Sequence, residues 1–176
     1  MPNPLFHEHF RPAIDIIRTQ LDVVHLGEGQ DYRLKHAAAI RGFGTGSWRI
    51  QTPAANNTPA IELNAAGHIV RARSVEHDAA VFTFNELCAQ PLGVAQYLWL
   101  AERFRAITLI SVPDLATVDR DPLARFANLI DVLYDREIPL HVCAAGEPRR
   151  LVDAVEPPRD AKRIVSRLSS LKAAEA

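Results

Sequence analysis

The sequence predicts an α/β protein in which a parallel sheet with flanking helices is joined to a segment rich in β-hairpins. In the second half of the chain, apolar strand-forming stretches such as 107–111 and 139–144 alternate with amphipathic helical stretches. This alternation is typical of parallel strands that helical crossovers connect and that are buried on both faces. In the middle of the chain, turn residues separate short strand-forming stretches instead, which indicates antiparallel hairpins.

The pattern divides the chain into three zones of one compact unit. Residues 1–30 are predicted to form an entry helix and a short strand, because apolar side chains recur there at helical spacing. Residues 31–88 form a β-rich segment, and residues 89–176 form the α/β segment with a C-terminal helix. A length of 176 residues allows such a unit to bury a core without a disulfide or a structural metal.

Apolar periodicity and turn residues set the bounds of the individual elements. Strands are predicted over residues 47–50, 60–63, 68–72, 80–84, 107–111 and 139–144, with a hairpin turn at Gly67. Helices are predicted over residues 93–105, 121–137 and 159–174.

The composition excludes several classes of partner. The chain has 20 basic and 21 acidic residues, so it lacks the basic field that holds nucleic acid or an anionic membrane. It has neither an apolar run long enough for a membrane span nor the layout of a signal peptide. Cys88 and Cys143 each lie in an apolar run, which suits the reduced thiols of a cytoplasmic protein. We therefore expect a cytoplasmic location.

A phosphate-binding loop is missing from the sequence. Such a loop needs Gly-Lys-Ser/Thr between a strand and a helix, and no Gly-Lys pair occurs in the 176 residues. The nearest imitation is Gly42-Phe-Gly-Thr-Gly-Ser47, which lacks the lysine and precedes a predicted strand. We interpret it as a flexible loop.

Two acidic or histidine-containing clusters are candidate metal sites. His7-Glu-His9 does not fit the spacing of a zinc-binding helix, and we interpret it as a solvated segment. Asp114, Asp119 and Asp121 could hold magnesium near a nucleotide, but helix capping and favourable first-turn charges explain them more simply. We therefore predict no catalytic residue and no metal ligand in this chain.

Arg163 and Arg167 are the strongest candidates for binding an anion. Their spacing of four places both guanidinium groups on one stripe of the last predicted helix, on its outer face. Like charges at this spacing weaken an isolated helix, whereas paired guanidinium groups bind phosphate or carboxylate well. An anionic partner therefore explains the pair better than local stability, and we expect Arg167→Ala to leave the stability almost unchanged. A solvated helix face is the alternative.

Several phrases together resemble the C-terminal half of the ZapE cell-division ATPase family, whose mitochondrial relatives include the lactation-elevated protein. The resemblance covers nearly the whole chain in order. The phrases that show it are Phe10-Arg-Pro-Ala-Ile14, Asp31-Tyr-Arg33, Ile61-Glu-Leu-Asn64, Phe82-Thr-Phe84, Tyr97-Leu98, Val112-Pro113, Arg125-Phe126, Leu129-Ile-Asp131, Leu133-Tyr134, Arg163 and Ser166-Arg-Leu168.

The resemblance implies a fold, a chemistry and partners. Members are P-loop ATPases related to AAA+ proteins, and bacterial members act at the division septum on FtsZ. Their phosphate loop and magnesium-binding acids lie upstream of the part that this chain matches. The chain would thus be an incomplete P-loop-NTPase-like sheet, with ATP and Mg²⁺ used only in the full-length parent. Arg163 and Arg167 would match the nucleotide-sensing residues, and the missing N-terminal ATPase half would be the first partner.

Departures from the family pattern leave a second hypothesis open. The family usually has Asp where this chain has Ser111, a second Arg where it has Ala124, and arginines near His7 to His9. The alternative is a non-catalytic α/β protein-interaction module that never meets ATP. If half of a sheet is missing, one edge strand should be unpaired with apolar surface beside it, and the chain should associate with itself or a partner.

Overall fold

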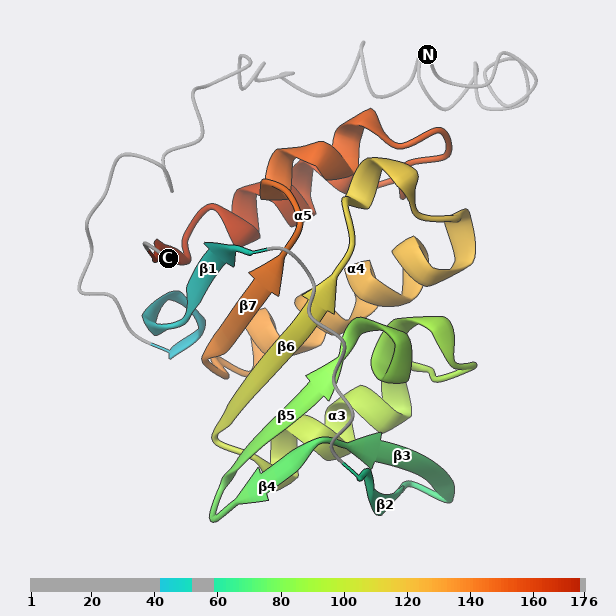
Figure 1. Cartoon of the computed structure of the whole chain (residues 1–176), viewed down its shortest axis with the longest axis vertical. Helices are drawn as coiled ribbons and strands as arrows, with labels where there is room; N and C mark the ends of the chain where they lie inside the picture. Colours follow the sequence, from blue (N-terminus) through green and yellow to red (C-terminus); the bar gives the residue numbers. More distant parts are fainter. Residues whose placement is uncertain (1–41, 52–58, 175–176) are drawn as a thin grey trace, which may run out of the picture. The chain divides into compact units, whose positions relative to one another are not determined.

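A six-stranded sheet forms the centre of the fold (Figure 1). The computed structural model describes residues 42–51 and 59–174, all within the unit Arg33–Ala176. The predictions for residues 1–30, including His7-Glu-His9, lie outside the described residues. The strand order is β4-β5-β6-β7-β1-β8, with β4 antiparallel to β5 and every other pair parallel. The strands are β1 (Ser47–Ile50), β4 (Ser74–Glu76), β5 (Ala79–Thr83), β6 (Ala106–Val112), β7 (Leu140–Ala144) and β8 (Lys172–Ala173).

The predicted hairpin forms a separate two-stranded sheet. Strands β2 (Ile61–Ala65) and β3 (His68–Ala72) pair antiparallel, with Ala65 opposite His68. The two turn residues, Ala66 and Gly67, both have positive φ, at 47° and 83°. Positive φ at both central positions is the geometry that matches the twist of a two-residue hairpin. The prediction of a hairpin turn at Gly67 is confirmed.

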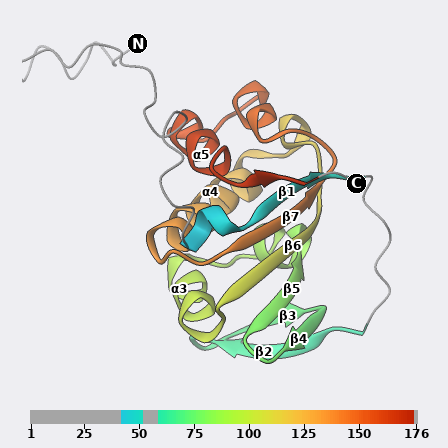
Figure 2. The same ribbon diagram turned by 90° about the vertical axis from the view of Figure 1, so that its left-hand side faces the viewer.

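The three α-helices of the described residues lie together on one side of the sheet (Figure 2). They are α3 (Val94–Arg103), α4 (Arg120–Asp135) and α5 (Ala161–Leu168). Strands β5, β6, β7 and β8 follow one another along the chain in the same direction as they are ordered across the sheet. Because crossovers between parallel strands are right-handed, a walk in one direction places every connecting helix on the same face. In the described part of the chain, no helix combines the length and apolarity that a bilayer crossing requires.

Burial along the strands follows this one-sided arrangement. The strand residues that face the helices are almost completely buried, among them Phe82, Leu109 and Val142. Their neighbours along the same strands, such as Thr108 and His141, are only partly buried. The prediction of strands buried on both faces is therefore wrong for the described residues. Apolar content alone did not reveal that one face carries smaller and more polar side chains.

Helix α4 supplies the middle of the core. Its buried side chains include Leu123, Phe126, Ile130 and Leu133, as the helical spacing predicts. The Phe126 ring packs against Phe84, with 5.9 Å between the ring centroids. The observed bounds of α3 and α4 fall within two residues of the predicted ranges.

The last helix is much shorter than the predicted range 159–174. Helix α5 ends at Leu168, where Ser169 Oγ donates to the Val165 carbonyl and Ser170 Oγ donates to the Arg167 carbonyl. Serine hydroxyl groups that bond to the backbone in this way compete with helix continuation. The chain then extends as β8, in which Lys172 N donates to the Gly46 carbonyl and adds a strand to β1.

A single wide turn, the π-helix η3 (Asn85–Ala89), follows β5. It begins with a reciprocal pair of bonds, because Thr83 N donates to Glu86 Oε2 and Glu86 N donates to Thr83 Oγ1. The wide turn leaves carbonyl groups without helical partners, and side chains satisfy two of them. Tyr97 Oη donates to the Leu87 carbonyl, and Arg125 Nε donates to the Cys88 carbonyl.

The glycine-rich stretch before β1 is a packed turn and not the flexible loop that the sequence suggested. It forms the 3₁₀-helix η2 (Gly42–Thr45), followed by Gly46 against β7. A Cβ on Gly46 would lie 2.0 Å from the Leu140 carbonyl oxygen. The glycine is thus required by the close approach of two backbones, which explains this stretch without a phosphate.

We expect Gly46→Ala to destabilise the protein by about 3 kcal/mol or more, because the new methyl group must displace the β7 backbone. Gly67→Ala is the control, since a Cβ there meets nothing within 4 Å. It should lose only about 1 to 2 kcal/mol through the positive φ. Urea unfolding followed by circular dichroism measures both, and equal losses would contradict the packing argument.

Candidate functional site

The carboxyl ends of the parallel strands bring together two segments that are distant in sequence. After β6, the chain turns at Pro113 and Asp114 into the 3₁₀-helix η4 (Leu115–Thr117). After β7, it passes Gly146 and enters the 3₁₀-helix η5 (Pro148–Asp153). In open α/β sheets, ligands bind outside this edge, so the residues here are the first candidates for a site.

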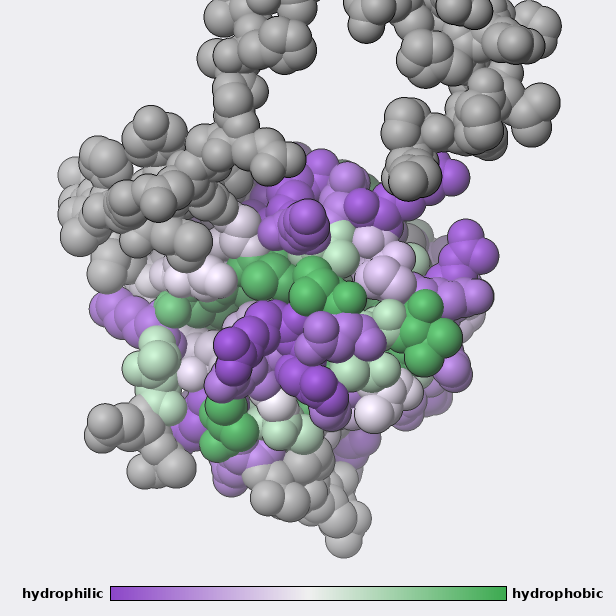
Figure 3. Space-filling model, turned by 90° about the horizontal axis from the view of Figure 1, so that it is seen from above, coloured by the Kyte–Doolittle hydropathy of each residue, from purple (hydrophilic) through white to green (hydrophobic). Residues whose placement is uncertain are grey.

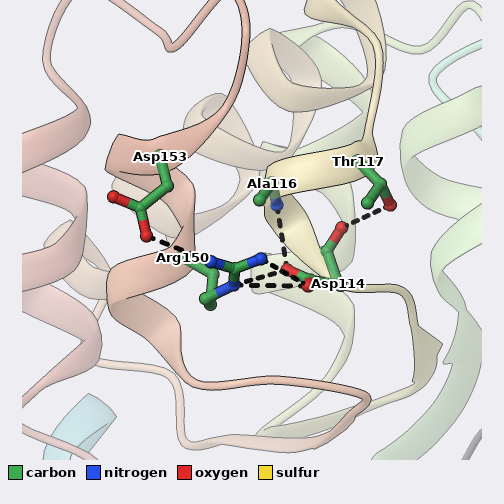
Figure 4. Close-up of polar contacts among 5 residues, drawn as sticks. All are labelled: Asp114, Ala116, Thr117, Arg150 and Asp153. Atoms are coloured by element: carbon green, nitrogen blue, oxygen red, sulfur yellow. Dashed lines mark hydrogen bonds and ion pairs between the residues drawn. The ribbon is translucent and has the colours of Figure 1, made fainter.

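Asp114 and Arg150 form a bidentate ion pair between these two segments (Figure 4). Arg150 Nε lies 3.1 Å from Asp114 Oδ1, and Arg150 Nη2 lies 2.9 Å from Asp114 Oδ2. The same carboxylate accepts from Ala116 N at 3.1 Å and so caps η4. The hydrogen bonds from Arg150, with the bond from Ala116, lower the pKa of Asp114 below its ordinary value. Asp114 is therefore held as an anion by groups of its own chain.

The three aspartates considered as a possible magnesium site do not form a metal-binding cluster. Asp114 is bound to Arg150, Asp119 is the N-cap of α4, and Asp121 lies in the first turn of α4. Among the described residues, no group of three acidic, histidine or cysteine side chains is placed to hold a metal ion. The capping interpretation describes Asp114 and Asp121 better than the metal interpretation.

Backbone strain also occurs at this edge. Ser111 has a φ of 55°, and the pairing between β6 and β7 shifts register between Leu109 and Val112. A positive φ is uncommon for serine and more readily adopted by Asp or Asn. An aspartate, which the family resemblance implies in place of Ser111, would suit this conformation better than serine does.

An apolar groove of about 410 Å³ lies beside the same end of β1 and β8. Its lining residues include Trp48, Ile50, Pro148, Leu168 and Leu171. Figure 3 views the molecule from above and shows a band of apolar side chains between polar ones. Within the described residues, β8 pairs only with β1. The association expected from an unpaired edge strand with apolar surface beside it stays a prediction.

Arg163 and Arg167 find their anionic partner within the chain. Arg163 Nη2 lies 2.7 Å from Asp131 Oδ2, and Arg167 Nη1 lies 2.7 Å from Asp131 Oδ1. Arg167 Nη2 also pairs with Asp135 at 2.9 Å, and its guanidinium stacks 4.4 Å from the centre of the Tyr134 ring. The two arginines of α5 thus grip the carboxylates of α4.

The burial of the two arginines differs. The Arg167 side chain is only 12% exposed, whereas Arg163 is 47% exposed and also pairs with Asp160. The prediction that both lie on an outer face is therefore wrong for Arg167. The sequence contained the signal for its partner, because Asp131 and Asp135 are spaced four apart on α4 as the arginines are on α5. Their nucleotide-sensing role stays a prediction.

Comparison with known proteins identifies the relatives of this chain. A sequence model of the family described as AFG1-like ATPase matches residues 1–176. The cell division protein ZapE of Escherichia coli K12 is 25% identical over 185 residues, which cover 98% of this chain and 49% of that protein. Lactation elevated protein 1 homolog B of Danio rerio is 28% identical over 167 residues, covering 86% of this chain and 33% of that protein. No solved structure matches.

The fold and the comparisons together define the class of this protein. The described residues form an α/β unit with a mostly parallel sheet, flanking helices and an antiparallel hairpin, which confirms the predicted class. The chain belongs to the AFG1-like ATPase family, and its resemblance to the ZapE and lactation-elevated proteins is confirmed. It spans about half the length of the ZapE proteins that it matches.

The ion-pair geometry reverses the sequence-based expectation for Arg167. Arg167→Ala should lower the stability of this chain by about 2 kcal/mol, because it leaves Asp131 and Asp135 without a largely buried partner. Arg163→Ala should lose less than about 1 kcal/mol, since that pair is half exposed. Thermal unfolding measures both. A Tm unchanged by Arg167→Ala would show that the contacts with α4 contribute nothing.

The lowered pKa of Asp114 gives a testable pH dependence. A group whose folded-state pKa is depressed stabilises the fold above its ordinary pKa, 3.8, and this contribution disappears as the pH falls through the folded value. Asp114→Asn should therefore be less stable than the wild type at neutral pH, and the difference should shrink between about pH 5 and pH 2. The control, Glu156→Gln on an exposed loop residue, should show no such convergence.

Proposed function

We propose that this chain is the C-terminal part of a ZapE-type ATPase, whose full-length form binds and hydrolyses ATP and serves cell division. The observation that carries the proposal is the match of all 176 residues to the AFG1-like ATPase family. The name of the bacterial relatives supports the role in cell division. A cytoplasmic location and FtsZ as a partner belong to the same proposal.

The proposed division of labour places the nucleotide chemistry outside this chain. A P-loop ATPase needs a glycine-rich loop with a lysine for the β- and γ-phosphates, and the sequence contains no Gly-Lys pair. The family implies ATP and Mg²⁺ for the full-length parent. The described residues do not offer a magnesium site, and the acid best placed at the sheet edge, Asp114, is tied to Arg150. We therefore assign no magnesium binding and no acid–base step to the acidic residues of this edge.

The two arginines of α5 differ in what they can contribute to nucleotide sensing. Arg163 is half exposed, and its contacts with Asp131 and the exposed Asp160 are surface ion pairs, so its guanidinium can turn toward a phosphate at small cost. Arg167 is held by two carboxylates and an aromatic ring. We assign nucleotide contact in the parent to Arg163, and we assign to Arg167 the positioning of α5 against α4.

A non-catalytic interaction module is the second candidate function. The partly buried face of the sheet opposite the helices favours it, because such a face suits a partner of any kind. This candidate differs from the first in one measurable property, since it requires no ATP turnover by any longer form of the protein.

Calorimetric titration with Mg-ATP and turnover assays test the proposal. The chain alone should show no measurable binding, and the full-length parent should hydrolyse ATP. In the parent, Arg163→Ala should lower turnover by about a hundredfold, the effect of losing roughly 3 kcal/mol of transition-state stabilisation. Arg149→Ala is the control, because Arg149 is exposed and, among the described residues, its ion pair is with the neighbouring Glu147. Micromolar binding by the chain alone, or a parent without turnover, would contradict the proposal.

A further inference from the structure

The face of the sheet opposite the helices carries a continuous row of side chains across all six strands. Backbone pairing places one residue from each strand side by side, and the order across the sheet is Ser74, Val81, Thr108, His141, Ser47 and Lys172. We call this surface the open face, defined by this row and by Ile110, Cys143 and Arg49 of the next row. In Figure 2 the labelled helices α3, α4 and α5 all lie on the other side of the sheet.

The central strands of the open face present no carboxylate, lysine or arginine. Strands β5, β6 and β7 turn alanine, valine, threonine, isoleucine, cysteine and one histidine toward it. The histidine, His141, already shares a hydrogen bond with Ser47 Oγ at 3.0 Å. Antiparallel sheets with a permanently wet face show polar residues there, whereas parallel sheets are covered on both faces. The composition of the open face is that of a covered surface.

Charged side chains stand only at the two ends of the open face. Arg49 and Lys172 lie at the β1 and β8 end, and Glu76 lies at the β4 end. An uncharged centre with a charged rim is the layout of a protein–protein or interdomain contact. Six strands at a spacing of about 4.8 Å span roughly 24 Å, enough for two helices of about 10 Å diameter side by side.

We propose that the open face is an interdomain surface, covered in the full-length parent by the nucleotide-binding half of the ATPase. The inference rests on the proposed function, and it adds the location of the contact between this chain and the nucleotide-binding half. The ZapE relatives are about twice as long as this chain, so they hold a second portion of similar size. The covering layer is helical and uncharged at its centre, and it places acidic side chains opposite Arg49 and Lys172.

The two cysteines make the proposal measurable. Cys143 lies on the open face and is partly accessible, whereas Cys88 is completely buried and burial raises the pKa of its thiol. A maleimide or disulfide reagent should therefore modify Cys143 in the folded chain, with Cys88 as an internal control that stays unmodified. In the full-length parent without nucleotide, Cys143 should react at least tenfold more slowly than in the chain alone.

A variant pair tests whether the open face itself provides the protection. Thr108→Arg puts a charge in the middle of the row and should restore fast modification of Cys143 in the parent. Ile69→Arg is the control, because Ile69 lies on the β2–β3 hairpin and is already 55% exposed. It should leave Cys143 protected. The comparison of the two wild-type proteins remains decisive even if Thr108→Arg fails to fold.

Three results would overturn the proposal. Equal rates in the chain and the parent would show that the open face is not covered by the other half. Protection in the chain alone that depends on concentration would assign the face to a second copy. Protection at every concentration would assign it to residues of this chain. If the parent hydrolyses ATP and its Cys143 reacts as fast as in the chain alone, the proposed interface is wrong and the proposed function is still supported. If Cys143 is protected in a parent that does not hydrolyse ATP, the proposed function is wrong and the proposed interface is still supported.

Discussion

The right-handedness of parallel crossovers is the constraint on which the rest of this structure depends. Strands β5, β6, β7 and β8 follow one another in a single direction, so each connecting helix must pack on the same face. Most of the large apolar side chains of the strands then turn to that face, where Phe82, Leu109 and Val142 are buried. The side chains at the alternate strand positions, which are mostly smaller or more polar, lie on the other face. One topological rule thus produces both a complete core and an incompletely covered sheet.

Helix α4 occupies the middle of this single layer, and polar contacts fix its neighbours relative to it. On one side Arg125 reaches the Cys88 carbonyl of the wide turn η3. On the other side Asp131 receives Arg163 and Arg167 of α5. Apolar packing tolerates small slides between helices, whereas hydrogen bonds to charged groups are directional. These contacts therefore specify one arrangement of the layer as well as stabilising it.

The elements that the sequence predicted well are those whose own residues determine them. The helical spacing in α4 and the positive-φ turn of the hairpin depend on neighbours within a few residues, and both appear as expected. Strand β8 was missed because two serines end α5 early, and β4 was missed because three residues show no period. The partial burial of one face could not be predicted, since it depends on the order of strands in space.

The sequence could not show which partner a charged residue has where that partner comes from a distant segment. Arg163 and Arg167 were correctly singled out as residues that need an anion, but their partner, Asp131, lies 32 and 36 residues away. Asp114 was considered as a metal ligand because its partner, Arg150, also lies 36 residues away. A single sequence shows which charges require a partner and leaves open which partner they have. The acidic residues of α4 and the arginines of α5 are each spaced four apart, and this match would have reduced the number of candidate partners.

The ion pair between Asp114 and Arg150 determines the role of the carboxyl edge of the sheet. The pairing of β6 with β7 shifts register at Leu109, and Ser111 adopts a strained backbone conformation at the same point. Beyond the shift, Val112 pairs with Ala144 again, and the ion pair connects the two segments that follow these strands. A catalytic acid at such an edge must be free to meet its ligand, whereas this one is neutralised by its own chain. The ion pair at this edge therefore holds two loops in place.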